Sequence, residues 1–157
     1  MPAGDLRFYR SSGDLPDTII ADVSGPFVHV DVDMGDGTAI GELSAGLKRY
    51  PVSPPAPPLV TIWSIAGHSS PLAIKAALLW AEHETWAHPE YGWLDVLDAG
   101  LRAIDPHAPY IGDPGEWDCS DFVTRFLIQA GVMLPLALEN EPHLVTPSAL
   151  ATALGVR

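Results

Sequence analysis

The feature that most constrains this chain is a strictly alternating segment, residues 27–34, that leads into a glycine-rich turn. Apolar and other side chains alternate along it, which is the pattern of a half-buried β-strand. The first set is Val28, Val30, Val32 and Met34, and the second is Phe27, His29, Asp31 and Asp33. Asp36-Gly37 is typical of a two-residue type I′ turn, and a return strand is expected over Thr38–Ser44. The segment therefore predicts an antiparallel hairpin.

A two-residue loop would fix the register of this hairpin. It would place Asp31 opposite Glu42 and His29 opposite Ser44. His29 and Glu42 would then be diagonal neighbours on one face, about 7–8 Å apart between backbones. Asp31 opposite Glu42 would be an unfavourable pair of like charges unless a proton or a cation lay between them.

Other segments predict further strands and helices. Two more strands are expected, and the five prolines between residues 50 and 58 predict a surface connector. Helix starts are indicated by Pro71 after two serines, by Asp118 as an N-cap, and by Thr146 before a proline. The expected strands are Thr18–Val23 and Leu59–Ala66, and the expected helices are Pro71–Ala87, Gly92–Ile104, Asp118–Ala130 with Gly131 as the C′ residue, and Thr146–Leu154.

Length and composition predict one domain over residues 1–157. Hydrophobic residues make up 47% and charged residues 18%, which favours a packed core. The chain has 8 basic and 20 acidic residues and a formal net charge of −12, so nucleic acids and anionic membranes are not expected partners. No apolar run approaches the roughly 18 residues of a membrane span. Residues 1–5 lack a basic start and an apolar run, which favours a protein that is cytoplasmic as synthesised.

Neither a metal nor a cofactor is expected. The single cysteine excludes an internal disulfide and a multi-cysteine zinc site. His83 and His88 are five residues apart, whereas the helical zinc motif needs a spacing of four. No phosphate-binding or dinucleotide-binding glycine motif is present.

Cys119 is the candidate nucleophile. It falls in the first turn of an expected helix, where unpaired backbone N–H groups and the helix dipole favour a thiolate. Asp118 and Asp121 act in the opposite direction, because nearby carboxylates raise the pKa of a thiol. The alternative is that Cys119 is a small buried hydrophobic residue, which is the commoner fate of a lone cysteine.

His29 is the candidate general base. It stands in mid-strand, and Glu42 on the same predicted face would accept a hydrogen bond from the imidazole and fix its tautomer. Asp31 is an alternative for this third position. The competing interpretation of His29 is a surface histidine on a sheet that is exposed on one side.

The chain resembles the circularly permuted NlpC/P60 (papain-like, YiiX-like) superfamily of cysteine hydrolases. Two motifs carry the resemblance: Gly25-Pro26-Phe27-Val28-His29-Val30-Asp31-Val32 before a Gly-Asp-Gly turn, and Trp117-Asp118-Cys119-Ser120-Asp121-Phe122-Val123 much later. The resemblance covers about residues 14–131. It implies an α+β fold, with a small antiparallel sheet packed on helices. Two residues depart from the family pattern, namely Asp31 in place of a glycine and Asp121 in place of a glutamate.

The resemblance also implies an activity. Cys119 would be the nucleophile, His29 the base and Glu42 the third, polar residue of a peptidase or amidase that forms a thioester. Peptides of the bacterial cell wall (peptidoglycan) would be the first substrate to consider. Two alternatives stay open: a non-enzymatic phage structural or accessory protein on the same fold, and a lipid ester or thioester hydrolase or acyltransferase. A phage-encoded or virion-associated protein would reconcile a wall substrate with the absence of a signal peptide.

Overall fold

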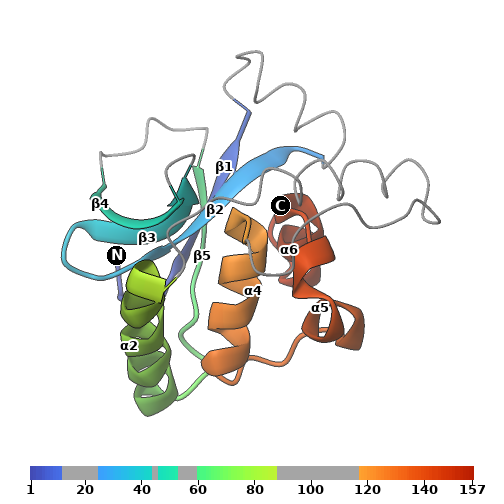
Figure 1. The fold of residues 1–157 in the computed structure, drawn as a ribbon. Coiled ribbons are helices and arrows are strands. Elements are labelled where there is room, and N and C mark those ends of the chain that lie inside the picture. The colour runs from blue at the N-terminus through green and yellow to red at the C-terminus, as the bar shows by residue number, and fades with distance from the viewer. Residues whose placement is uncertain (12–24, 44–45, 53–59, 88–116) are drawn as a thin grey trace.

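The computed structural model describes residues 1–11, 25–43, 46–52, 60–87 and 117–157. The described part is a mixed α/β structure, shown in Figure 1. Its strands are β1 (Leu6–Arg10), β2 (Phe27–Asp33), β3 (Thr38–Leu43), β4 (Gly46–Pro51) and β5 (Val60–Trp63). Its helices are α2 (Pro71–Ala87), α4 (Cys119–Gln129), α5 (Leu136–Asn140) and α6 (Pro147–Ala153), with a 3₁₀ turn at Pro142–Leu144.

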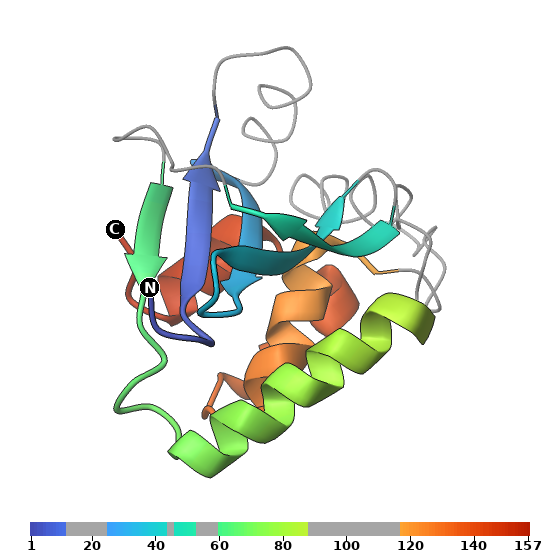
Figure 2. The same ribbon diagram turned by 90° about the vertical axis from the view of Figure 1, so that its left-hand side faces the viewer.

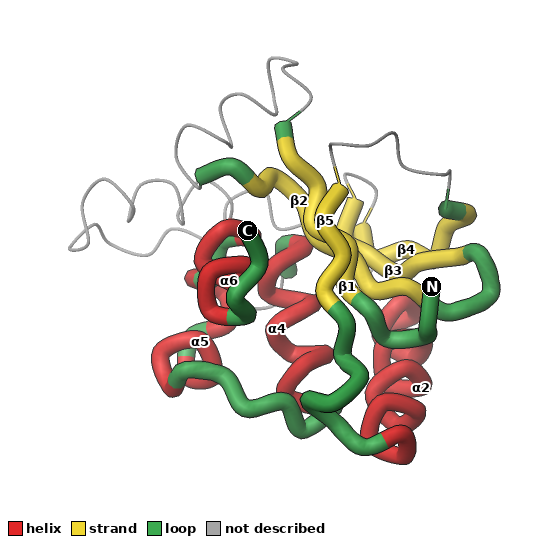
Figure 3. The backbone as a smooth tube through the Cα atoms, turned by 180° about the vertical axis from the view of Figure 1, so that it is seen from behind, coloured by secondary structure: helices red, strands yellow, loops and turns green. Residues whose placement is uncertain are grey.

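The five strands form one antiparallel sheet in the order β4-β3-β2-β1-β5. The sheet is strongly twisted, and in Figure 2 β3 and β4 run across the direction of β1 and β5. The helices lie together on one side of the sheet, as the view from behind in Figure 3 also shows. A small antiparallel sheet packed on helices is thus confirmed as the fold class.

One face of the sheet, which we call the helix face, is packed against the helices. It carries Leu6 and Phe8 of β1, Val30 and Val32 of β2, and Ile40 of β3, all fully buried. These side chains form one core with Phe122, Val123, Phe126 and Leu127 of α4. Because strand side chains alternate, the residues between them lie on the other face. That opposite face carries Arg7, Tyr9, His29, Asp31 and Tyr50.

Local sequence signals placed three helices correctly. α2 has the predicted bounds. At α4 the Asp118 carboxylate accepts a hydrogen bond from the Asp121 N–H at 2.7 Å, and Gly131 after the helix has a φ of +70°. At α6 the Thr146 hydroxyl accepts from the Ala149 N–H at 3.1 Å. The expected strand at residues 59–66 appears as the shorter β5, whereas the expected strand 18–23 and helix 92–104 lie outside the described residues.

The predicted hairpin register is wrong by one residue. Val32 pairs with Ile40 and Asp33 with Ala39, and the Met34 N–H donates to the Thr38 carbonyl at 2.9 Å. The loop is therefore three residues long, Gly35 to Gly37. A type I′ turn needs a positive φ at Asp36, but the positive φ angles fall on Gly35 (+81°) and Gly37 (+86°) instead. The two glycines occupy the positions with positive φ, which other residues rarely adopt. The longer loop moves the pairing of β2 with β3 by one residue.

The shift in register changes which residues lie next to Asp31 and Glu42. A one-residue slip moves a side chain to the other face of a sheet. Glu42 therefore lies on the helix face, whereas His29 and Asp31 lie on the opposite face. Asp31 is paired across the sheet with Arg7 of β1, so the like-charge pair with Glu42 does not form. The alternation also breaks at Phe27, because a bulge between Tyr9 and Arg10 lets Phe27 enter the core.

Candidate functional site

Cys119 is the first residue of α4, and its side chain reaches the sheet. Only 4% of the residue is exposed, and it belongs to the apolar core. The backbone N–H groups of Val30, Ser120 and Cys119 itself lie close enough to the sulfur to favour its charged form. The sulfur therefore touches the main chain of β2 at the residue that follows His29. Residues about ninety positions apart in the sequence are brought together at this point.

The thiol of Cys119 is neutral in this arrangement. Burial raises its pKa well above the ordinary value, and the negative charge of Asp118 raises it further. The three backbone N–H groups lower the pKa, but they do not compensate. A buried thiol of this kind becomes a nucleophile only when a base removes its proton during attack.

His29 belongs to the opposite face of the sheet. It is paired with Tyr9 of β1, and the two rings lie with centroids 5.4 Å apart. Its Nε2 atom is only 3.5 Å from the point where a Cβ on Gly41 would stand. The imidazole thus leans from β2 over the neighbouring strand β3, and the absence of a side chain at Gly41 leaves room for it.

The sulfur and the imidazole approach the same interruption in the sheet. In the described strands, the pairing of β2 with β3 is confined to Val32–Ile40 and Asp33–Ala39. Towards the start of β2 the ladder is not continued, and the Val30 N–H is directed to the Cys119 sulfur instead. Cys119 reaches this interruption from the helix face, whereas His29 leans over its edge from the opposite face.

Glu42 lies beneath the start of α4. It is 1% exposed, and among the described residues neither of its carboxyl oxygens has a hydrogen-bond partner. Burial, followed by the charge of Asp118, raises its pKa to about 9, although Lys48 acts in the opposite direction. Burial likewise raises the pKa of Asp118 to about 7. Glu42 is therefore a neutral carboxylic acid at pH 7, and the structure does not place it on the same face as His29.

We predict that Glu42→Gln removes a pH-dependent loss of stability. The unfolded chain releases the Glu42 proton near pH 4.5, but the folded chain holds it up to about pH 9. Stability from this group is thus complete below pH 4.5 and is lost as the pH rises towards 9, at about 1.4 kcal/mol per pH unit. Asp118 contributes a similar loss that fades above about pH 7, so Glu42 dominates the interval from pH 7 to 8.

Urea denaturation at pH 7 and 8 measures this effect. The wild-type free energy of unfolding should fall over that interval, and most of the fall should be absent in Glu42→Gln. The exposed Glu141 offers a matched control, and Glu141→Gln should keep the wild-type slope. Equal slopes in all three proteins would show that Glu42 is ionised in the folded state.

Asp31 is the centre of a polar cluster that the sequence did not predict. Its oxygens accept from Arg7 Nε at 2.7 Å and Arg7 Nη2 at 2.8 Å, and from the hydroxyls of Tyr9 at 3.0 Å and Tyr50 at 2.5 Å. Arg7 and Asp31 are both fully buried. The only available signal was the alternation of polar and apolar residues in Leu6–Arg10, which is too short to indicate an individual partner.

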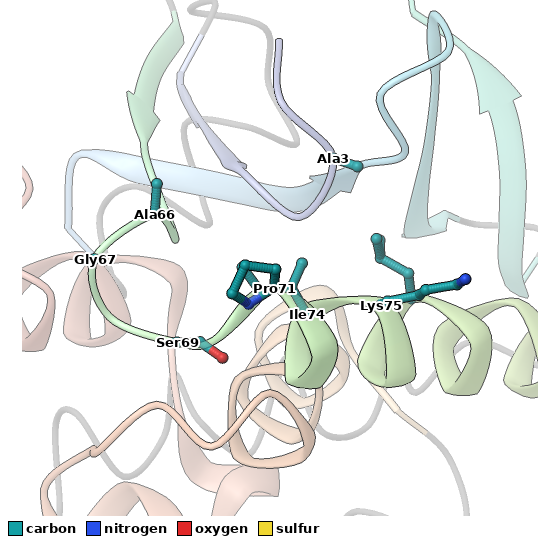
Figure 4. Close-up of a pocket in the computed structure, with 8 residues that line it drawn as sticks. Ala3, Ala66, Gly67, Ser69, Pro71, Ile74 and Lys75 are labelled. Carbon is teal, nitrogen blue, oxygen red and sulfur yellow. The ribbon is translucent and has the colours of Figure 1, made fainter.

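A separate pocket lies at the start of α2, and none of the candidate residues lines it. Figure 4 shows its walls, which come from the N-terminal segment, the turn after β5 and the first turns of α2. Of the described residues that line it, Lys75 alone is charged. Among the described residues, no group of three or more His, Cys, Asp or Glu side chains is arranged to hold a metal ion.

Comparison with models of known protein families gives no match, and a search of curated proteins gives none. None of the helices in the described ranges has both the length and the apolar character needed to cross a membrane.

Proposed function

We propose that the protein is a cysteine-dependent amide hydrolase of papain-like type, with Cys119 as the nucleophile and His29 as the general base. The observation that carries the proposal is the contact of the Cys119 sulfur with the Val30 N–H, one residue from His29. The interruption between β2 and β3 and the glycine at position 41 support it, because both leave room for the imidazole beside the interruption that the sulfur reaches from the helix face. The resemblance of the two motifs to the permuted NlpC/P60 superfamily supports it independently.

In the proposed reaction, the Cys119 sulfur attacks the carbonyl carbon of an amide while His29 takes the thiol proton. The oxyanion is held by the N–H groups of Cys119 and Ser120 at the start of α4. The C–N bond then breaks, His29 returns the proton to the leaving amine, and a thioester remains. Water, deprotonated by His29, hydrolyses the thioester to a carboxylic acid and the free thiol.

The orientation of His29 does not rest on Glu42 in this proposal. Glu42 lies on the helix face and carries its proton at neutral pH. It is therefore not the carboxylate that stabilises the positive charge of a protonated His29. Its position under Asp118 suits a different contribution, because a neutral Glu42 avoids a second negative charge beside the thiol. We propose cell-wall peptides as the substrate class on the resemblance alone, since a fold does not specify a substrate.

The thioester provides the direct test. Incubation with a panel of cell-wall peptides, followed by an acid quench, should give a covalent adduct on Cys119 in the intact mass spectrum. Neutral hydroxylamine should remove this adduct, as expected for a thioester. Cys119→Ala should form no adduct and should lose about 1,000-fold or more of the hydrolysis rate. Hydrolysis of the same peptides at the wild-type rate by Cys119→Ala would exclude the proposal.

A second candidate is a non-enzymatic module in which Cys119 is only a core residue. The burial of the sulfur among apolar side chains and the raised pKa of the thiol favour it. In that case α4 would be anchored to β2 through Cys119 without any chemistry. Cys119→Ala would then change stability, and no adduct would form in the wild-type protein.

A further inference from the structure

The polar cluster formed by Arg7, Tyr9, Asp31 and Tyr50 adjoins the candidate base. The pairing of Arg7 with Asp31 and of Tyr9 with His29 puts these residues on one face of β1 and β2. Tyr50 reaches them from β4, across the intervening strand β3. The cluster therefore links three strands next to the interruption where the Cys119 sulfur lies.

A buried ion pair is costly unless its remaining hydrogen-bonding capacity is used. Here one carboxylate oxygen of Asp31 accepts from the hydroxyls of both tyrosines as well as from Arg7. Burial and the charge of Asp31 raise the pKa of both tyrosines above the ordinary value. Both hydroxyls are therefore fixed as donors to Asp31, and each tyrosine ring is held in one orientation.

Both tyrosines lie against the volume that His29 occupies. The Tyr9 ring packs on the imidazole with an interplanar angle of 48°. The Tyr50 hydroxyl is 3.0 Å from the point where a Cβ on Gly41 would stand, and His29 Nε2 is 3.5 Å from the same point. Asp31 Cβ is 2.9 Å from it. Asp31, Tyr50 and His29 thus surround the space that a side chain at position 41 would fill.

We propose that Asp31, neutralised by Arg7, is a positioning residue that acts through Tyr9 and Tyr50 to hold the imidazole of His29 over Gly41. This inference rests on the proposed function, in which His29 takes the proton of Cys119. The sequence predicts a carboxylate that binds the imidazole directly. In this proposal the carboxylate of Asp31 instead fixes the orientation of two aromatic neighbours of the imidazole. This role also accounts for the departure from the family pattern at position 31, because a glycine there would leave Arg7 and both hydroxyls without this acceptor.

The experiment is the rate of alkylation of Cys119 by iodoacetamide between pH 5 and 9. The chain has one cysteine, so the reaction reports one thiol. Tyr9→Phe, Tyr50→Phe and Gly41→Ala should each lower the rate at pH 7 about tenfold, since small displacements of a catalytic group have large effects on rate. The charged groups that share this face, Arg7, Asp31, Asp33 and Lys48, are unchanged in all three variants. In each variant, the pH at which alkylation reaches half of its maximal rate should also differ from the wild-type value.

Controls separate positioning from folding. Asp33→Asn alters another buried carboxylate on the same face of β2, which accepts from the Gly35 N–H, and it should keep the wild-type rate and pH profile. Urea denaturation of each variant shows whether the fold is retained, and the loss of one tyrosine hydroxyl that donates to a carboxylate should cost about 1.5–3 kcal/mol. Tyr9→Phe and Tyr50→Phe proteins that are folded and react at the wild-type rate would overturn the inference.

A His29→Gln arm distinguishes the inference from the proposed function. If His29→Gln slows alkylation and the two tyrosine variants do not, the positioning role is wrong and the proposed base stands. If His29→Gln reacts at the wild-type rate, the proposed base is wrong, and the positioning role fails with it. Slower reaction in all four variants is the result that we expect.

Discussion

Arg7→Met should lower the free energy of unfolding by about 3–5 kcal/mol, a large share of the stability of a small domain. Arg7 donates two hydrogen bonds to Asp31, and both side chains are fully buried. Methionine fills a similar volume but leaves the carboxylate of Asp31 in the sheet without its counter-charge. The hydroxyls of Tyr9 and Tyr50 still donate to it, which keeps the penalty within this range.

The chain contains a matched control for this substitution. Arg49 pairs with Asp36 and Glu82 at the surface, and about a third of its side chain is exposed. Exposed ion pairs contribute at most about 1 kcal/mol, so Arg49→Met should cost far less than Arg7→Met. The double variant Arg7→Met/Asp31→Leu should recover most of the lost stability, because neither charge then remains buried. Equal losses for Arg7→Met and Arg49→Met in urea would contradict the burial of the Arg7–Asp31 pair.

The parts of the fold that could be predicted from the sequence are those fixed by local chemistry. Pro71, Asp118 and Thr146 each satisfy or remove an unpaired N–H at a helix start, and this holds wherever the helix packs. β1 was missed because five residues give too little periodicity to separate a strand from an irregular terminus. β4 was missed because its residues adjoin the proline-rich connector, and the strand ends at Pro51 on the edge of the sheet.

The candidate site was predicted less completely, because its geometry depends on a register. Cys119 at a helix start and His29 on a strand follow from local patterns. The side of the sheet on which Glu42 lies depends on whether the loop holds two or three residues, and both glycines of the turn permit the longer loop. The partner of Asp31 could not be predicted, since Arg7 comes from a strand that only the tertiary structure places beside β2.

His29→Gln should have the largest effect on the reactivity of the thiol. The thiol of Cys119 is neutral at rest because burial and Asp118 raise its pKa, so its reaction near neutral pH requires a base. A positioned general base contributes about 100-fold or more. Glutamine keeps a similar size and polarity but has no proton-accepting nitrogen at neutral pH, so the variant should lose this factor and keep its stability.

The most direct measurement is the rate of Cys119 alkylation by iodoacetamide at pH 6 in the wild type, His29→Gln and the control His83→Gln. The side chain of His83 is 77% exposed on α2, so its substitution should leave the rate unchanged. We expect the wild type and His83→Gln to react about 100-fold faster than His29→Gln. The same slow rate in all three proteins, rising only at alkaline pH, would show that no imidazole removes the proton of the Cys119 thiol. This result would contradict the proposed hydrolase.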